Sequence, residues 1–332
     1  MPEREQLRAT FVALAGWGNA SERLLAGDAS FRKYFRYTRG SKSVVVMDAP
    51  PPQEDVRPFV RVGRHLLELG LSAPEILAQD AERGFLLLED FGDDTFARVL
   101  KNGGDERALY YRAVDVLVAL RGAGSRALLP GLPAYAGEAM IDAAMLLPEW
   151  YLPEATGRPT SEEIGESYRA VWRQCLADMP AEPTTLLLRD FHKDNLMWLA
   201  ERSGVRACGL LDFQDAQSGH AGYDLVSLIE DARRDVAPAV HSAVLEHYLD
   251  ESGIADRQAF VTGFRLAGAQ RHARIIGLFV RLLRRDGKPE YLPHLPRVWR
   301  MFERSLQHEA LAPLREWVDT HLPPALRRIG ST

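Results

Sequence analysis

The chain has 332 residues, of which 46% are hydrophobic and 26% charged, and its formal net charge is −5. This length allows one large domain or two modest ones, and the composition is typical of a globular protein rather than a disordered or fibrous one. A net negative charge provides no global basic field, so we expect neither nucleic acid nor a membrane as a partner, although local basic patches are compatible with it. The sequence does not predict an oligomeric state.

The cysteines and the N-terminus bear on the cellular compartment. Cys175 and Cys208 lack the spacing of a metal site, so we expect both to be packed thiols in a reducing environment. Residues 1–6 do not resemble a secretory signal, and no apolar run approaches the ~18 residues needed to span a bilayer. We therefore expect a cytoplasmic protein.

The N-terminal region predicts one helix and three strands. Residues 3–16 carry apolar side chains at helical spacing and are followed by glycines, which is typical of an amphipathic helix. Residues 24–26, 33–38 and 43–47 are separated by turn residues and predict three antiparallel strands. Residues 27–31 form the turn between the first two strands, and a Gly-Asp-Ala-Ser sequence suits an ordinary hairpin turn.

A helix and a further strand follow. Prolines at positions 50–52 end the third strand, because proline cannot continue a hydrogen-bonded ladder. Residues 57–69 have the apolar pattern of a helix, with Gly70 as its stop. Residues 84–88 predict the last strand of a small lobe, and we expect the lobe boundary near residue 93, after which the pattern is helical.

The second region is predicted to be mainly helical, with one unusual insert. Residues 109–120 and 161–176 predict long helices. Between them, residues 134–159 are rich in proline and aromatic residues, and residues 149–151 place a tryptophan and a tyrosine after a glutamate. An exposed aromatic pair beside a carboxylate suits a sugar site, because ring faces stack on the C–H face of a sugar. Packing of these aromatic side chains in the core is the alternative.

The most informative polar residues lie between positions 185 and 215. Short apolar strands there predict a hairpin with acidic residues at both ends. Asp190 and Asn195 are five residues apart, and Asp212 follows the hairpin. In kinase-like phosphotransferases such an aspartate accepts the proton of the substrate hydroxyl, while the asparagine and the later aspartate hold Mg²⁺. Magnesium keeps several water ligands, so two protein ligands suffice. For any one of these residues taken alone, turn formation is the alternative.

This segment resembles the catalytic loop of the aminoglycoside phosphotransferase-like small-molecule kinases. Asp190, His192 and Asn195 occupy the matching positions, followed by Asp212 where the metal-binding aspartate would be. A later glycine-to-Asp-Leu turn contains Asp224, which the resemblance implies is a structural residue that braces the loop. The sequence departs from the family at position 188, where a leucine replaces the histidine of many relatives.

The resemblance implies the fold class and the nucleotide contacts. We expect an α+β, bilobal, protein-kinase-like fold, with a small β-rich N-terminal lobe at residues 1–92 that binds ATP. A large, mainly helical C-terminal lobe at residues 93–332 would carry catalysis and the acceptor. The implied nucleotide contacts lie in the first hairpin turn and in the hinge after the last strand: Gly27, Asp28, Ala29, Ser30, Phe31, Arg32, Glu89 and Phe91.

One expected kinase feature is missing. The third strand should carry a lysine that contacts the α and β phosphates, yet residues 45–48 contain none. Either Arg32, Lys33 or Lys42 supplies the positive charge from elsewhere, or the enzyme relies on magnesium and backbone donors. A degenerate, non-catalytic kinase fold is the alternative.

A basic segment lies in the last third of the chain. Arg271 and Arg274 lie one turn apart on a single face of a predicted helix, with His272 offset from them. Such a pair is able to bind a carboxylate or acidic partner residues. A solvated charged face is the default interpretation.

Five further segments resemble the anomeric N-acetylmuramate/N-acetylglucosamine kinases of bacterial cell-wall recycling: residues 29–36, 46–51, 148–151, 212–216 and 270–272. This implies magnesium-dependent transfer of the γ-phosphoryl group of ATP to the C1 hydroxyl of an N-acetylated amino sugar. The implied acceptor contacts are Glu149, Trp150, His192, Asp215 and Arg271. An aminoglycoside, choline or a similar amino alcohol is the alternative acceptor, and a nucleotide-binding regulator is the alternative to an enzyme.

Overall fold

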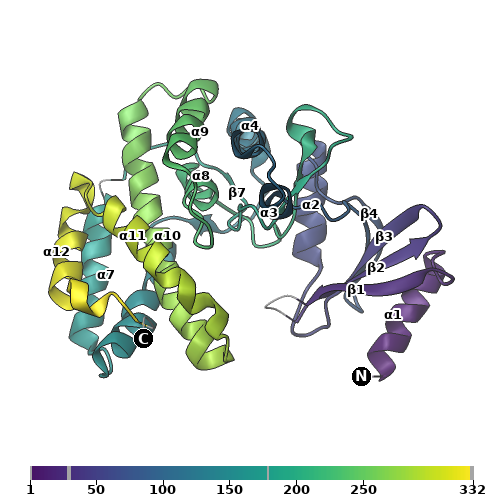
Figure 1. Ribbon diagram of the computed structural model, residues 1–332, viewed down its shortest axis with the longest axis horizontal. Helices are drawn as coiled ribbons and strands as arrows, with labels where there is room; N and C mark the ends of the chain where they lie inside the picture. Colours follow the sequence, from purple (N-terminus) through teal and green to yellow (C-terminus); the bar gives the residue numbers. More distant parts are fainter. Residues whose placement is uncertain (1, 28–30, 178, 330–332) are drawn as a thin grey trace. The chain divides into compact units, whose positions relative to one another are not determined.

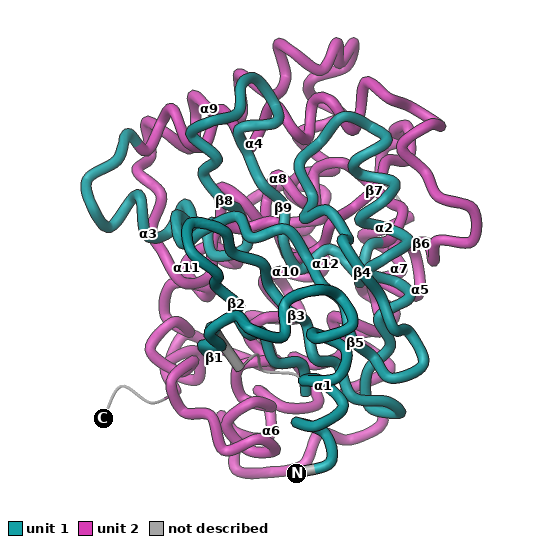
Figure 2. The backbone as a smooth tube through the Cα atoms, turned by 90° about the vertical axis from the view of Figure 1, so that its right-hand side faces the viewer, with its two compact units in different colours: residues 1–105, 193–216 teal, residues 106–192, 217–332 magenta. Residues whose placement is uncertain are grey.

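The computed structural model describes residues 2–27, 31–177 and 179–329. The chain forms two compact units, which Figure 2 shows in different colours. Unit 1 comprises Met1–Asp105 and Lys193–Ala216, and unit 2 comprises Glu106–His192 and Gln217–Thr332. Asp190 therefore belongs to unit 2, whereas Asn195 and Asp212 belong to unit 1. The predicted functional division at residue 93 stays a prediction.

Unit 1 contains a five-stranded antiparallel sheet in the order β1-β2-β3-β5-β4. Its strands are β1 (Ser21–Gly27), β2 (Lys33–Arg39), β3 (Lys42–Asp48), β4 (Ile76–Asp80) and β5 (Phe85–Glu89). Helix α1 (Pro2–Leu14) packs Phe11 and Val12 against this sheet. The three predicted strands and the first helix are confirmed. The edge strand β4 was not predicted, because its sequence ILAQD contains no run of buried apolar residues.

Two helices and a hairpin complete unit 1. The helices are α2 (Arg57–Glu68) and α3 (Phe96–Lys101), and the antiparallel hairpin consists of β8 (Leu196–Trp198) and β9 (Cys208–Leu210). Gly70 follows α2 with a φ of +80°, as its predicted role as a helix stop requires. Phe213 joins the hairpin segment to α2, since its ring lies 4.7 Å from that of Phe59. The predicted hairpin and helix are therefore confirmed.

Unit 2 is mainly helical (Figure 1). Its α-helices are α4 (Glu106–Gly122), α5 (Glu138–Ala144), α6 (Leu152–Thr156), α7 (Glu162–Ala177), α8 (Gly222–Ile229), α9 (Pro238–Glu251), α10 (Arg257–Asp286), α11 (Leu295–Ser305) and α12 (Ala312–His321). A π-helical turn, η2 (Leu147–Tyr151), lies between α5 and α6. The small sheet consists of β6 (Ala134–Tyr135), β10 (Gln217–Gly219) and β7 (Thr185–Leu187). Helix α10 packs against α8, α11 and η2, so it forms the centre of the unit.

The two long helices predicted for unit 2 are present in the structure. The predicted helix at 109–120 lies within α4, and the predicted helix at 161–176 matches α7 apart from its first residue. The amide of Ile164 donates to the hydroxyl of Ser161 at 3.3 Å, which is the capping contact expected at the start of α7. Cys175 and Cys208 are both buried, as predicted for packed thiols.

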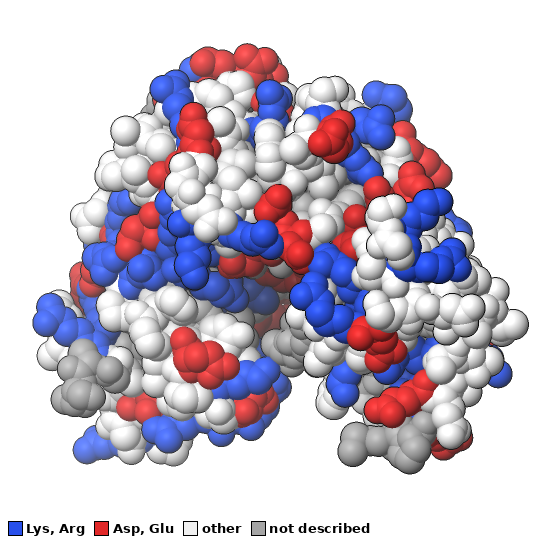
Figure 3. All heavy atoms as spheres, turned by 45° about the vertical axis from the view of Figure 1, so that its right-hand side comes forward, with Lys and Arg blue, Asp and Glu red and all other residues white. Residues whose placement is uncertain are grey.

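Two surface properties can be stated for the described part of the chain. Its helices include none with the length and apolar character that a membrane crossing requires. The face shown in Figure 3 carries basic and acidic side chains together, so it does not present a single sign of charge.

Candidate active site

The segment that carries Asp190 is held in place by Asp224. This segment directly follows β7, which pairs with β10. The Asp224 carboxylate, in the first turn of α8, accepts hydrogen bonds from the backbone amides of Leu188 at 2.6 Å and Arg189 at 3.0 Å. Arg189 has a φ of +72°, a conformation that costs energy for a residue other than glycine. These two hydrogen bonds stabilise the strained backbone immediately before Asp190.

The charges in unit 2 favour an ionised Asp190. Burial would raise the pKa of Asp190, but the positive charges around it, led by Arg274, outweigh burial and leave this pKa below its ordinary value. Burial raises the pKa of Asp224 to about 6, although its two amide donors and Arg189 act in the opposite direction. The structure therefore places an anionic carboxylate at position 190, where it can accept a hydrogen bond from a hydroxyl group.

The basic face of α10 is buried, so its interpretation as a solvated face is wrong. Arg271 is only 3% exposed, and its Nη2 donates to the hydroxyl of Ser227 at 2.8 Å. His272 is fully buried, with its Nε2 3.2 Å from the Glu230 carboxylate. The physical reason is that α8 packs against this part of α10 and brings polar partners into the interior. Periodicity alone cannot distinguish buried arginines from exposed ones.

Unit 1 contains a cavity of about 480 Å³, which is within the range of small-molecule sites. Both predicted metal ligands and part of the predicted hinge line it. Its lining residues are Leu25, Tyr34, Arg36, Val45, Phe59, Pro74, Leu88, Glu89, Asp90, Phe91, Gly92, Asp93, Thr95, Asn195, Met197, Leu211 and Asp212. The cavity therefore combines apolar walls with a few charged groups.

Asp212 and Asn195 lie together in this cavity. Asn195 Nδ2 is 3.4 Å from one carboxylate oxygen of Asp212, and Gln214 Nε2 donates to the other at 2.8 Å. Asp212 has a φ of +57°, so its side chain is presented from a strained backbone. No cluster of three His, Cys, Asp or Glu side chains suited to a metal occurs among the described residues. One carboxylate and one amide oxygen nevertheless fit Mg²⁺, which takes its other ligands from phosphates and water.

Positive charge near Asp212 comes from Arg32. Arg32 Nη2 lies 3.5 Å from the Asp212 carboxylate, whereas the side chains of Lys33 and Lys42 are exposed. Of the three candidates for the missing lysine, the structure brings Arg32 to the predicted metal ligand.

Sequence reasoning missed Arg36, which also lines the cavity. Arg36 is opposite Val45 in the β2–β3 register, so both side chains lie on the same face of the sheet. Its guanidinium pairs with Asp90 at 2.6 Å and Asp93 at 2.7 Å. Counting the strand register from the turn at Gly40 would have placed Arg36 opposite Val45, on the strand that lacks the expected lysine.

The other nucleotide contacts predicted in the first hairpin turn are only partly described by the structure. Asp28, Ala29 and Ser30 lie outside the described residues, and Gly27 ends β1. Phe31 is exposed, and its amide donates to Glu54 at 3.2 Å.

The hinge residues make contacts within unit 1. The amide of Glu89 donates to the carbonyl of Glu75 at 2.8 Å, and its carboxylate pairs with Arg202. Phe91 covers Gly209 so closely that a Cβ there would lie 2.9 Å from the ring. These contacts fix the hinge backbone.

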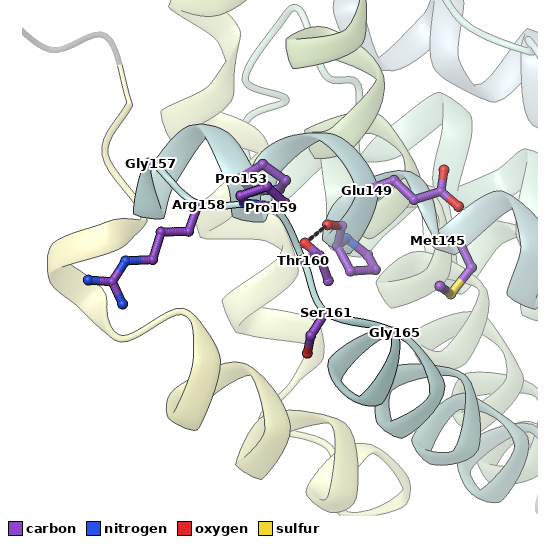
Figure 4. A pocket seen from close by; sticks show the side chains of 10 residues that line it. Met145, Glu149, Pro153, Gly157, Arg158, Pro159, Thr160, Ser161 and Gly165 are labelled. Carbon is purple, nitrogen blue, oxygen red and sulfur yellow. Dashed lines mark hydrogen bonds between the residues drawn. The ribbon is translucent and has the colours of Figure 1, made fainter.

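The insert contains a second cavity, of about 680 Å³, within unit 2 (Figure 4). It is lined by Met145, Pro148, Glu149, Pro153, Gly157, Arg158, Pro159, Thr160, Ser161 and Gly165. The Thr160 hydroxyl donates to the carbonyl of Pro148 and closes the loop around it. Burial raises the pKa of Glu149, while Arg169 and Arg281 act in the opposite direction.

Of the two interpretations of Trp150 and Tyr151, core packing holds for Tyr151. Tyr151 is fully buried, and its hydroxyl donates to the carbonyl of Leu326 at 2.9 Å. Trp150 is partly buried and packs against the core of unit 2, so an exposed aromatic pair is not present. Both residues lie in the π-helical turn η2, which packs against α10. Asp215, the acceptor candidate in unit 1, is exposed and lies 3.4 Å from Gln214 Nε2.

An antiparallel sheet with a ligand-sized cavity, together with a helical unit carrying a braced aspartate segment, defines a phosphotransferase of the protein-kinase-like fold. Solved structures with this fold include a choline/ethanolamine kinase family protein from Mesorhizobium loti, with a TM-score of 0.64, 17% identity, and coverage of 97% of this chain and 98% of that one. Another is the streptomycin–ATP–APH(2″)-IIa ternary complex, with a TM-score of 0.55, 18% identity, and coverage of 91% and 96%. The predicted fold class is confirmed.

The chain belongs to the phosphotransferase enzyme family, whose sequence pattern matches residues 21–260. It is 36% identical to an N-acetylmuramate/N-acetylglucosamine kinase from Caulobacter vibrioides, covering 98% of this chain and 99% of the relative. It is 38% identical to a kinase of the same name from Pseudomonas aeruginosa, covering 89% and 87%. The predicted resemblance and the predicted enzyme class, a phosphotransferase, are confirmed.

Proposed function

We propose that this enzyme transfers the γ-phosphoryl group of ATP to the anomeric C1 hydroxyl of N-acetylmuramate, N-acetylglucosamine or both, giving the sugar 1-phosphate. The observation that carries this proposal is the similarity, along nearly the whole chain, to relatives named as kinases of these two sugars. The neighbour bound to streptomycin and ATP supports ATP as the donor. Under this proposal the enzyme acts in the cytoplasm, on sugars released from the cell wall.

Asp190 is the proposed catalytic residue. Its carboxylate would accept a hydrogen bond from the C1 hydroxyl and take its proton as the phosphoryl group is transferred. The positive charges that keep Asp190 ionised also make it a weak base, so its main contribution would be to orient the hydroxyl. Asp224 supports this role through the amides that it holds before Asp190.

The cavity of unit 1 is the proposed nucleotide site. Its apolar walls suit an adenine ring, and the backbone of Glu89 and Phe91 would meet the ring edge. Asn195 and Asp212 would hold Mg²⁺, which supplies compensation for phosphate charge when bound. Arg32 lies beside Asp212, so we assign it the phosphate contact that a strand lysine makes in other kinases.

The acceptor contacts are proposed in unit 2, with Asp215 added from unit 1. Glu149 lines a cavity and is able to accept hydrogen bonds from sugar hydroxyls. Trp150 is partly buried, so only the exposed part of its ring would be able to stack on the sugar. His192 and Arg271 are buried, and the charge of Arg271 acts on the Asp190 carboxylate. Burial lowers the pKa of His192, which favours its neutral ring.

Magnesium-dependent ATP consumption tests the proposal. The panel contains N-acetylmuramate, N-acetylglucosamine, an aminoglycoside and choline, and phosphorus NMR identifies the position of the phosphate on each product. We expect turnover with the N-acetyl sugars and a phosphate on C1. Preferred turnover of choline or the aminoglycoside, or a phosphate on another hydroxyl, would contradict it.

A further inference from the structure

Glu149 and Arg281 lie on neighbouring elements of unit 2. Helix α10 crosses η2 so closely that a Cβ on Gly277 would lie 2.0 Å from the carbonyl oxygen of Leu146. Arg281 follows Gly277 by one turn of α10, and Glu149 lies in η2. The close crossing therefore brings this turn of α10 to η2, whose Glu149 lines the cavity of Figure 4.

Arg281 differs in its contacts from the neighbouring arginines of α10. Among the described residues it forms no ion pair or hydrogen bond, and its Nε is buried. Its neighbours on the helix differ, since Arg284 binds Glu154 at 2.7 Å and Arg285 binds Asp286 at 2.7 Å. A buried guanidinium nitrogen without a hydrogen-bond partner is unfavourable unless a ligand satisfies it.

The electrostatic surroundings favour an anion at Arg281. Burial lowers the pKa of Arg281, and the positive charges of Arg285 and Arg274 lower it further, which outweighs the carboxylates nearby. Arg274 is also the positive charge that acts most strongly on Asp190. Arg274 and Arg281 are two turns apart on one face of α10, about 10 Å along the axis. A positively charged stripe thus runs from the proposed catalytic residue toward Glu149.

We propose that Arg281 and Glu149 form a subsite for the acceptor, in which Arg281 binds a carboxylate of the acceptor and Glu149 accepts hydrogen bonds from its hydroxyl or amide groups. The inference rests on the proposed function. N-acetylmuramate carries a lactyl carboxylate and N-acetylglucosamine does not, so this subsite would distinguish the two sugars. Arg281 then determines specificity without taking part in phosphoryl transfer.

The test compares both sugars in wild-type protein and in Arg281→Gln. A charge-assisted pair lost from a partly buried site lowers affinity by about 10- to 100-fold, so the ratio of kcat/KM for N-acetylmuramate to that for N-acetylglucosamine should fall by this factor. Arg281→Lys should recover part of the ratio. Arg284→Gln is the matched control on the same helix and should leave the ratio unchanged. A ratio that stays within about twofold in Arg281→Gln overturns the subsite.

The methyl ester of N-acetylmuramate provides a second arm, because it removes the charge from the ligand instead of the protein. If the two groups interact, esterification should weaken calorimetric binding to wild-type protein and have little further effect in Arg281→Gln. If esterification weakens binding equally in wild-type protein and in Arg281→Gln, the subsite is overturned. Calorimetry measures binding without turnover, so it tests the subsite even if neither sugar is phosphorylated. Absence of phosphorylation would refute the proposed function separately.

Discussion

At the scale of single residues, the two strained backbone positions adjoin the proposed chemistry. Arg189 and Asp212 are the non-glycine residues with positive φ among the residues that the structure describes. Arg189 precedes Asp190, and Asp212 presents its carboxylate toward Asn195. Strained backbone persists only where surrounding contacts hold it, and the Asp224 hydrogen bonds do so at Arg189. We infer that the fold keeps these conformations in order to aim two carboxylates.

Asp190→Asn should lower kcat by at least about 100-fold, because it preserves the shape of the side chain but removes the proton acceptor. Affinity for ATP, measured by calorimetry, should hardly change. Asp194→Asn is a suitable control, since Asp194 is an exposed carboxylate in the same segment and pairs with Lys193 at 2.9 Å. A variant at position 190 that keeps more than a tenth of wild-type turnover would place the base elsewhere.

Asp212→Ala should raise the magnesium concentration needed for half-maximal activity as well as lower turnover. The substitution removes the carboxylate from the proposed metal site, where it lies 3.5 Å from Arg32. Titration of activity with magnesium at saturating ATP measures the effect. An unchanged magnesium requirement would show that Asp212 does not hold the metal.

At the scale of elements, α10 organises unit 2. It packs against α8, α11 and η2, and it carries Arg271, Arg274 and Arg281. Glycines allow its close contacts, because the backbone of η2 occupies the place where a side chain of residue 277 would lie. Packing at this crossing therefore positions the acceptor side of the proposed site.

Gly277→Ala should destabilise the protein by about 1–3 kcal/mol, the usual range for overpacking a core. The change would otherwise favour a helix by about 1 kcal/mol. Gly268→Ala in the same helix is the matched control, since a Cβ there would meet its nearest neighbour, Ser305 Oγ, at 3.4 Å. Denaturant unfolding of both variants measures the difference. Equal stability of the two would show that η2 can move away from α10.

At the scale of the whole molecule, buried titratable groups tie stability to pH. Burial lowers the pKa of His220 to about 4, with a further contribution from Arg121, and its Nδ1 accepts a hydrogen bond from the Gly222 amide at 3.0 Å. This contact requires an unprotonated ring nitrogen. Since the unfolded chain binds the proton at higher pH, the stabilisation is complete above about pH 6.5 and is lost as pH falls toward 4.

The free energy of unfolding should therefore fall as pH decreases from about 6.5 to 4, with His220 contributing up to about 1.4 kcal/mol per pH unit. Asp224, whose pKa is raised to about 6, acts in the opposite direction over this window. Comparison of wild-type protein with His220→Gln isolates the histidine. The stability difference between the two should shrink on acidification, and a constant difference would contradict a neutral, buried His220.

The sequence by itself determined the local structure and the family. Apolar periodicity and turn residues predicted α1, three strands of the sheet, α2, α4 and α7, because these elements bury one continuous face. It missed β4, an edge strand in which buried and exposed positions do not form an apolar run. Asp190, Asn195 and Asp212 were predicted from family spacing in a loop, which requires no knowledge of packing, and their roles stay predictions.

Tertiary structure alone decided which side chains are buried and what they contact. Arg271 and Tyr151 have ordinary surface-compatible sequence patterns, yet packing of α8 and η2 against α10 encloses both. Strand register brought Arg36 opposite Val45, on the strand that lacks the expected lysine, and the close approach at Gly277 brought α10 to η2. These contacts join residues that are far apart in the chain, and their free energy depends on neighbours that no local sequence pattern specifies.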